Sequence, residues 1–428
     1  MAAGAAALAA ASAVGRMNTG QATRQPPRLA WSAAWRITSR IVSSVALGAT
    51  LLLLARISPV RSYGEFAVAG AVTTIAGTVF GFGAPSRVLR VAAEDHSMRR
   101  RDRLEPVSLI RGLYLLHLGI NLALVAVMLI GAAVLGFPAT VAAGIVWGTG
   151  ETLQAYAQNH FAGIGRHRVS SWLIATQRVV PCAAVVAYLV MGRPANYPMV
   201  AAAFAVPALI AAATPLVSVA GAHGDFIAAA RGSLGWWGLG LSNVLLQLQL
   251  PVLAAVSSTA VAGLFAMASK VIGPVLLLPA SMATVVIPEL ARRLHTGGAW
   301  DLYHKFSRVC LAYMGVALLC AWPAGIVVTH VAGPRYAAAI PLVAGMVAAA
   351  GLSAYSQAFT AMLVAGGRPN QATACIAGGA IVTLVLLAIL GAWGPIESLA
   401  VVQVGAELVV LPGMAIWVRR LRAANVVP

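Results

Sequence analysis

Ionisable side chains lie inside several long apolar segments, and the chemistry available to them is charge recognition. Lys270, Arg178 and Glu151 each stand well away from the nearest polar loop. A charge in the hydrocarbon region of a membrane costs at least ~2.5–3.5 kcal/mol on insertion scales, so each group requires a partner or a water-filled cavity. Cations that line such a cavity would bind an anion, since guanidinium forks match phosphate geometry.

Lys270 is the cation whose surroundings favour a cavity. It lies about 10 Å inside its predicted span at 1.5 Å per residue, and Gly273 and Pro274 follow it. These two residues would kink the helix and open space beside the lysine, whereas snorkelling or structural pairing is the alternative. Arg178 lies at a similar depth, and for it cavity lining and structural pairing both stay open.

The predicted fourth span carries a polar stripe. Glu151, Gln154 and Gln158 follow the spacing of one helical face. Such a stripe either lines a passage or bonds to neighbouring helices.

Polar residues also share a face in the predicted seventh span, where Asn243 and Gln247 stand one turn apart. Because this span precedes the helix of Lys270, the sequence predicts a polar surface between the two. Glu407, in the last span, is expected to pair with a cation or to be structural.

Two arginines, Arg36 and Arg40, stand one turn apart at the predicted cytoplasmic mouth of the first span. They either anchor the span by the positive-inside rule or capture an anionic headgroup.

The elements that position these residues are transmembrane helices. Sixty per cent of the 428 residues are hydrophobic and 9% are charged, far from the roughly 25% charge of a soluble domain. At ~20 apolar residues per span, the fold class is an all-α polytopic membrane protein of about twelve helices. The predicted spans are 37–57, 64–84, 109–134, 139–163, 171–191, 198–220, 236–257, 263–288, 308–331, 339–363, 373–393 and 396–418.

An internal repeat divides these spans. Gly64, Phe66, Ala67 and Ala69 recur nearly half a chain length later as Gly263, Phe265, Ala266 and Ala268. The repeat predicts two six-helix bundles around a central cavity, residues 36–231 and 232–422, with binding at their interface. Residues 1–35 are expected to be a disordered basic tail and residues 423–428 a short one.

The distribution of basic residues predicts the orientation of the chain in the membrane. The formal net charge is +18, but most basic residues fall in alternate loops, as the positive-inside rule requires, so no nucleic acid is expected as a partner. The distribution predicts that both termini are cytoplasmic.

The sequence lacks the common nucleotide-binding, catalytic and zinc-binding motifs. It contains no P-loop, no Gly-x-Ser-x-Gly, no His-Glu-x-x-His and no paired zinc spacing. We therefore expect a protein that is not an enzyme and that has neither cofactor nor metal.

Four short motifs resemble those of bacterial polysaccharide transporters, the flippases for O-antigen and capsule repeat units within the multidrug/oligosaccharidyl-lipid/polysaccharide exporter superfamily. They lie on the same twelve-span plan, and the resemblance covers about residues 36–422. The motifs include Arg56, Pro59, Tyr63, Gly64 and Phe66, then Gly83, Arg87, Arg90 and Glu94, then Gly333, Pro334, Tyr336 and Ala339, and finally Ala365, Gly366, Arg368 and Pro369.

The resemblance implies alternating access of an undecaprenyl-diphosphate-linked oligosaccharide across the bacterial inner membrane. Only Arg40 has a matched role, because it is similar to the arginine of a Ser-Arg pair at the start of span one in related lipid II flippases. Polysaccharide polymerase or glycosyltransferases are candidate partners. The alternatives are a cation-coupled multidrug exporter of the same superfamily, which would need buried carboxylates, and an inactive membrane scaffold for glycan assembly.

Overall fold

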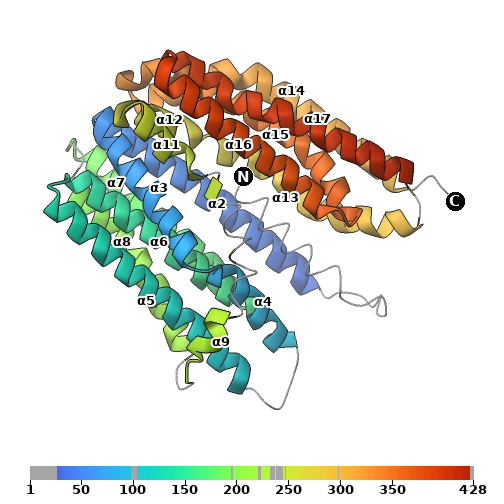
Figure 1. The fold of residues 1–428 in the computed structure, drawn as a ribbon, viewed down its shortest axis with the longest axis horizontal. Helices are drawn as coiled ribbons and strands as arrows, with labels where there is room; N and C mark the ends of the chain where they lie inside the picture. Colours follow the sequence, from blue (N-terminus) through green and yellow to red (C-terminus); the bar gives the residue numbers. More distant parts are fainter. Residues whose placement is uncertain are drawn as a thin grey trace. The chain divides into compact units, whose positions relative to one another are not determined.

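The computed structural model describes residues 27–97, 104–193, 196–219, 223–231, 237, 244–245, 247–296 and 298–424. Throughout these residues the regular structure is helical (Figure 1), which confirms the all-α fold class. Most of the predicted tail, residues 1–35, lies outside them.

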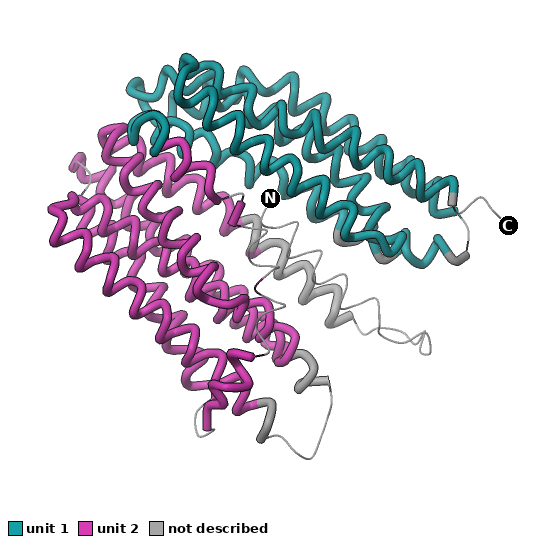
Figure 2. The backbone as a smooth tube through the Cα atoms, viewed as in Figure 1, with its two compact units in different colours: residues 1–23, 255–428 teal, residues 24–254 magenta. Residues whose placement is uncertain are grey.

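The chain forms two compact units, shown in Figure 2: Arg24–Ala254, here called the first unit, and Ala255–Pro428, the second unit. The predicted division after residue 231 stays a prediction, because residues 232–236 and 238–243 lie outside the described residues. Short helix α11 (Gln249–Val256) spans the division between the units.

The helices of the first unit are α2 (Pro27–Ile57), α3 (Val60–Phe80), α4 (Ala84–Ser97), α5 (Leu104–Val134), α6 (Ala139–Gly163), α7 (His167–Val190), α8 (Tyr197–Ser218) and α9 (Phe226–Arg231). Those of the second unit are α12 (Thr259–Ser269), α13 (Ile272–Thr296), α14 (Ala299–Ala332), α15 (Ile340–Ala365), α16 (Pro369–Trp393) and α17 (Ala400–Ala424), with 3-10 turns η1 (Pro334–Ala339) and η2 (Ile396–Leu399).

In the described part of the chain, nine helices are long and apolar enough to cross a membrane. Every predicted span overlaps described helix, but the eighth overlaps two helices and only part of the seventh is described. The chain is therefore a multi-pass membrane protein.

Two local predictions need correction. The predicted spans leave residues 85–108 as a connection between two membrane helices, but α4 (Ala84–Ser97) occupies much of that segment. Val88 and Ala92, one turn apart, are buried at 0% exposure, and the Arg87 guanidinium donates to backbone carbonyls of α9. A local face that packs against α5 and α6 therefore stabilises a helix in a basic segment.

The eighth span is the second correction, because it is two helices rather than one. α12 ends at Ser269 and α13 begins at Ile272. Pro274 has no N–H to donate to the carbonyl of Lys270, and its ring would clash with that carbonyl in a continuous helix. The expected kink is thus a full break, and Lys270 is the residue that caps α12.

One helix occupies the centre of each unit. α6 packs against α3, α4, α5, α7 and α8, and α15 packs against α12, α13, α14, α16 and α17. The repeated residues are core positions in both units, since Phe66 and Phe265 are each fully buried. The sequence repeat therefore reflects equivalent packing in the two units.

Small residues let α6 approach α3 closely. A Cβ on Gly144 would lie 2.3 Å from the carbonyl oxygen of Phe66, and one on Gly148 would lie 2.5 Å from that of Gly70. Because membrane helices associate through such close packing, this Gly-x-x-x-Gly pair fixes the helix that carries the polar stripe.

Candidate functional site

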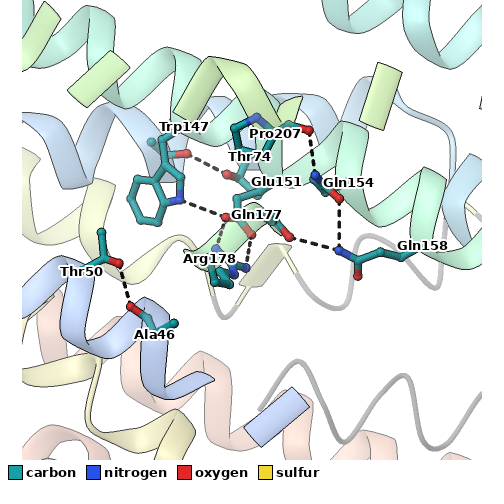
Figure 3. A network of polar contacts seen from close by, with 11 residues as sticks. Ala46, Thr50, Thr74, Trp147, Glu151, Gln154, Gln158, Gln177, Arg178 and Pro207 are labelled. Atoms are coloured by element: carbon teal, nitrogen blue, oxygen red, sulfur yellow. Dashed lines mark hydrogen bonds and ion pairs between the residues drawn. The ribbon is translucent and has the colours of Figure 1, made fainter. Parts of the chain in front are cut away.

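A bidentate ion pair joins α6 to α7 in the first unit (Figure 3). Nη2 of Arg178 lies 2.7 Å from Oε2 of Glu151, and Nη1 contacts Oε1. The indole Nε1 of Trp147 also donates to Oε1 of Glu151, at 2.9 Å. The Arg178 and Glu151 side chains are 13% and 24% exposed, so the pair is mostly but not completely buried.

The position of this pair follows from the turn between the two helices. α6 ends at Gly163 and α7 begins at His167, so the helices form an antiparallel hairpin. Glu151 and Arg178 each lie roughly 16–18 Å along their helix from that turn, at 1.5 Å per residue. Equal distances bring the two side chains to the same level.

The glutamines of the stripe bond to neighbouring helices. Gln158 Nε2 donates to Gln177 Oε1 of α7 at 3.0 Å, and Gln154 Nε2 donates to the Pro207 carbonyl of α8 at 2.8 Å. Gln154 is fully buried. The stripe thus joins α6 to α7 and α8 in the first unit (Figure 3). The Arg178 side chain beside it is 13% exposed.

A second buried polar group, which the sequence reasoning missed, joins α5 to α6. Asn121 Nδ2 donates to the His117 carbonyl at 2.8 Å, Thr152 Oγ1 donates to Asn121 Oδ1 at 2.5 Å, and His117 Nε2 lies 3.2 Å from the Thr152 carbonyl. The His117 ring stacks on Tyr156 with centroids 5.2 Å apart. His117 and Asn121 are each 1% exposed, so this cluster is structural. Their spacing of one turn within an apolar span was the available signal.

In the second unit, the break at Lys270 places polar backbone within a predicted span. Lys270 is partly buried, and its carbonyl cannot receive a helical bond from Pro274. Pro279 has the same effect on the carbonyl of Val275, which instead accepts a hydrogen bond from the Tyr313 hydroxyl of α14 at 2.5 Å. Pro274 thus favours the break between Lys270 and α13, and the Tyr313 hydroxyl of α14 hydrogen-bonds to α13.

The other predicted site residues are placed less fully. The side chains of Arg36 and Arg40 lie outside the described residues, although the backbone of both belongs to α2, and Asn243 lies outside them altogether. Oε1 of Gln247 is buried without a hydrogen-bond partner among the described residues. Gln247 and Lys270 belong to different units.

Within the described residues, no three His, Cys, Asp or Glu side chains are grouped so that they could hold a metal ion.

Sequence comparison finds neither a family model nor a curated protein that matches the chain. Solved structures do match. The inward closed conformation of the lipid II flippase MurJ aligns with a TM-score of 0.70 at 12% identity, over 91% of this chain and 87% of MurJ.

Two further structures belong to the MOP superfamily by their descriptions. An inward-facing multidrug resistance MATE family transporter aligns with a TM-score of 0.59 at 14% identity, over 91% of this chain and 98% of the transporter. A MOP superfamily transporter from Pyrococcus furiosus aligns with a TM-score of 0.56 at 13% identity, over 92% and 96%. The chain has the fold of MOP superfamily transporters. That fold confirms the all-helical membrane architecture that the sequence resemblance implied.

Proposed function

We propose that this protein moves an undecaprenyl-diphosphate-linked oligosaccharide across the bacterial inner membrane by alternating access. The observation that carries the proposal is Arg178, a partly exposed guanidinium on a span of the first unit whose counter-ion is a protein carboxylate. A diphosphate offers the same bidentate geometry as Glu151 with more negative charge. The cargo would therefore compete with Glu151 for the guanidinium.

The similarity to MOP superfamily transporters also supports a lipid-linked cargo. The lipid II flippase structure gives the highest TM-score of the three matches described above, and its name describes a lipid-linked cargo. In the proposal, both termini are cytoplasmic, Arg36 and Arg40 meet the cargo at the cytoplasmic mouth, and Lys270 contributes from the second unit. Gln154, Gln158, Asn243 and Gln247 would support the polar surface.

Multidrug export is the second candidate, because a MATE family transporter also matches the fold. A cationic drug would need a carboxylate to bind it. Glu151 is paired with Arg178, so a cationic drug would have to displace that arginine. For both the flippase and the exporter, we propose a transporter that catalyses no chemical reaction.

Deletion of the gene tests the function. We expect lipid-linked oligosaccharide to accumulate in the membrane and surface glycan to fall, with drug susceptibility unchanged. A drop in drug resistance without accumulation would favour the exporter instead. Unchanged lipid-linked oligosaccharide together with unchanged surface glycan would remove the flippase proposal.

Residue variants test the cationic site. Lys270→Ala combined with Arg40→Ala should reduce export at unchanged protein level, because two cations facing the diphosphate are lost. Arg335→Ala is the matched control, since Arg335 is an exposed cation in η1 of the second unit. Export is measured as surface glycan per unit of membrane protein. Wild-type export by the double variant would refute the role of these cations.

A further inference from the structure

A buried carboxyl group in the second unit is not used by the proposed cargo site. Glu407 lies in the middle of α17, about 10 Å along the helix from its start at 1.5 Å per residue. The residue is 5% exposed, and its Oε2 has no hydrogen-bond partner among the described residues. It is thus an acid in the interior of a membrane-spanning bundle.

The helices packed against α17 provide no cation for this acid. α17 packs against α15, α16 and η2. Neither α15 nor α16 contains any Lys, Arg, His, Asp or Glu, and their other titratable groups are Tyr355 and Cys375. The charged group of η2 is Glu397, which is exposed. The expected cationic partner of Glu407 is therefore absent from the described part of its surroundings.

The basic residues of α17 itself are also distant. Arg419, the first of them, lies about 18 Å further along the helix axis at 1.5 Å per residue. The polar neighbours are the Ser353 hydroxyl of α15, which lies beside the carboxyl group, and Gln403, a buried residue one turn earlier on α17. Both neighbours are uncharged.

A carboxyl group in such a place must bind either a proton or a cation, because an unpaired carboxylate in an apolar interior is strongly unfavourable. A hard metal cation takes about six oxygen ligands, whereas one carboxyl, one hydroxyl and one amide are the polar side chains identified around Glu407. A proton needs only the carboxyl oxygen. The chemistry of the surroundings therefore selects the proton.

We propose that Glu407 is a proton-binding site, whose carboxylate takes up one proton from water to form the neutral acid and returns it when the second unit opens that position to water. The net charge of the unit changes by one in each cycle. The link between this proton and cargo movement rests on the proposed function, but proton binding itself does not.

Infrared difference spectroscopy of the purified full chain in lipid vesicles, recorded across a pH titration, tests the site. We expect a carbonyl band of a protonated carboxylic acid that disappears in Glu407→Gln. Glu397→Gln, which neutralises the exposed acid at the start of the same region, is the control and should keep the band. Removing sodium should not change it.

Three outcomes would overturn the proposal: an unchanged band in Glu407→Gln, no protonated-acid band at any pH in the wild type, or a band that appears only when sodium is withdrawn. If Glu407→Gln does not fold, Ser353→Ala keeps the acid and removes its hydroxyl neighbour, and it should shift the frequency of the band. An unshifted band in that variant contradicts the site. Because no cargo is present, failure of this test leaves the export assay independent.

Discussion

The two units differ in the surroundings of the acidic residue that each carries within its membrane-spanning helices. The first unit holds its mid-span carboxylate, Glu151, against Arg178 on an adjacent helix. The second unit buries Glu407 among helices α15 and α16, which carry no charged residue. The first unit thus contains an ion pair within its spans, and the second contains an acid to which the described residues supply no cation.

The difference matters because paired and unpaired groups respond to different stimuli. A paired guanidinium can exchange its carboxylate for another anion, whereas an isolated acid responds to protons. Placing the two kinds of group in separate units would allow cargo and proton to be handled at separate sites.

Breaking the ion pair should have the largest effect on stability. We expect Arg178→Gln to lower the free energy of unfolding by about 2–3 kcal/mol, less than the ~3–5 kcal/mol typical of fully buried pairs because both side chains are partly exposed. The double variant Arg178→Gln with Glu151→Gln should lose less than the single variant, because no unpaired charge is left. Denaturant unfolding in detergent measures both.

Arg193→Gln is the control for this series, since Arg193 is exposed just beyond the end of α7. It should leave stability unchanged. Equal losses in the single and double variants would mean that the pair contributes through shape rather than charge.

Removing the hydroxyl that supports the broken helix should have a smaller effect. Tyr313→Phe leaves the Val275 carbonyl without its hydrogen bond, and a buried acceptor left unsatisfied costs about 1–2 kcal/mol. Thermal unfolding of the variant measures the loss. Tyr355→Phe, which removes a hydroxyl that makes no hydrogen bond among the described residues, should be close to neutral. A Tyr313→Phe variant as stable as the control would mean that the Val275 carbonyl needs no donor.

The smallest effect is expected at the exposed carboxylate of the second unit, Glu289, which follows the apolar part of α13. Hydrogen bonds from Arg292 and then Arg293 lower the pKa of Glu289 from 4.5 to about 2. A depressed folded-state pKa stabilises the protein above the unfolded value, and that contribution is lost as the pH falls from 4.5 towards 2. Glu289→Gln should therefore leave the pH dependence of unfolding unchanged at neutral pH.

The pH dependence of unfolding also distinguishes the exposed Glu289 from the buried Glu407. The pH dependence of the wild type and of Glu289→Gln, measured by denaturant unfolding, should differ only in acid. A difference near neutral pH would contradict this prediction.

Much of the architecture was predictable from local pattern. Spans are recognised because about twenty consecutive apolar residues are a property of the segment itself. The same local reasoning missed α4, since its basic residues resemble a loop while its Val88 and Ala92 face the bundle. It anticipated a bend near Pro274 but not that α12 would end at Lys270.

The candidate site was predictable only in part. Glu151 and Arg178 were each identified by depth, and their equal distance from the turn at 164–166 could have suggested the pair. The bond from Gln154 to the Pro207 carbonyl could not be anticipated. It depends on which turn of α8 faces α6.

The sequence by itself determined that this chain crosses a membrane many times, that its two halves repeat, and that a few charges lie within its spans. Hydropathy and charge are carried by each segment and need no partner to be recognised. Only the tertiary structure decided that Arg178 neutralises Glu151 and that no described residue supplies a cation to Glu407, because the counter-ion of a buried charge comes from whichever helices pack beside it.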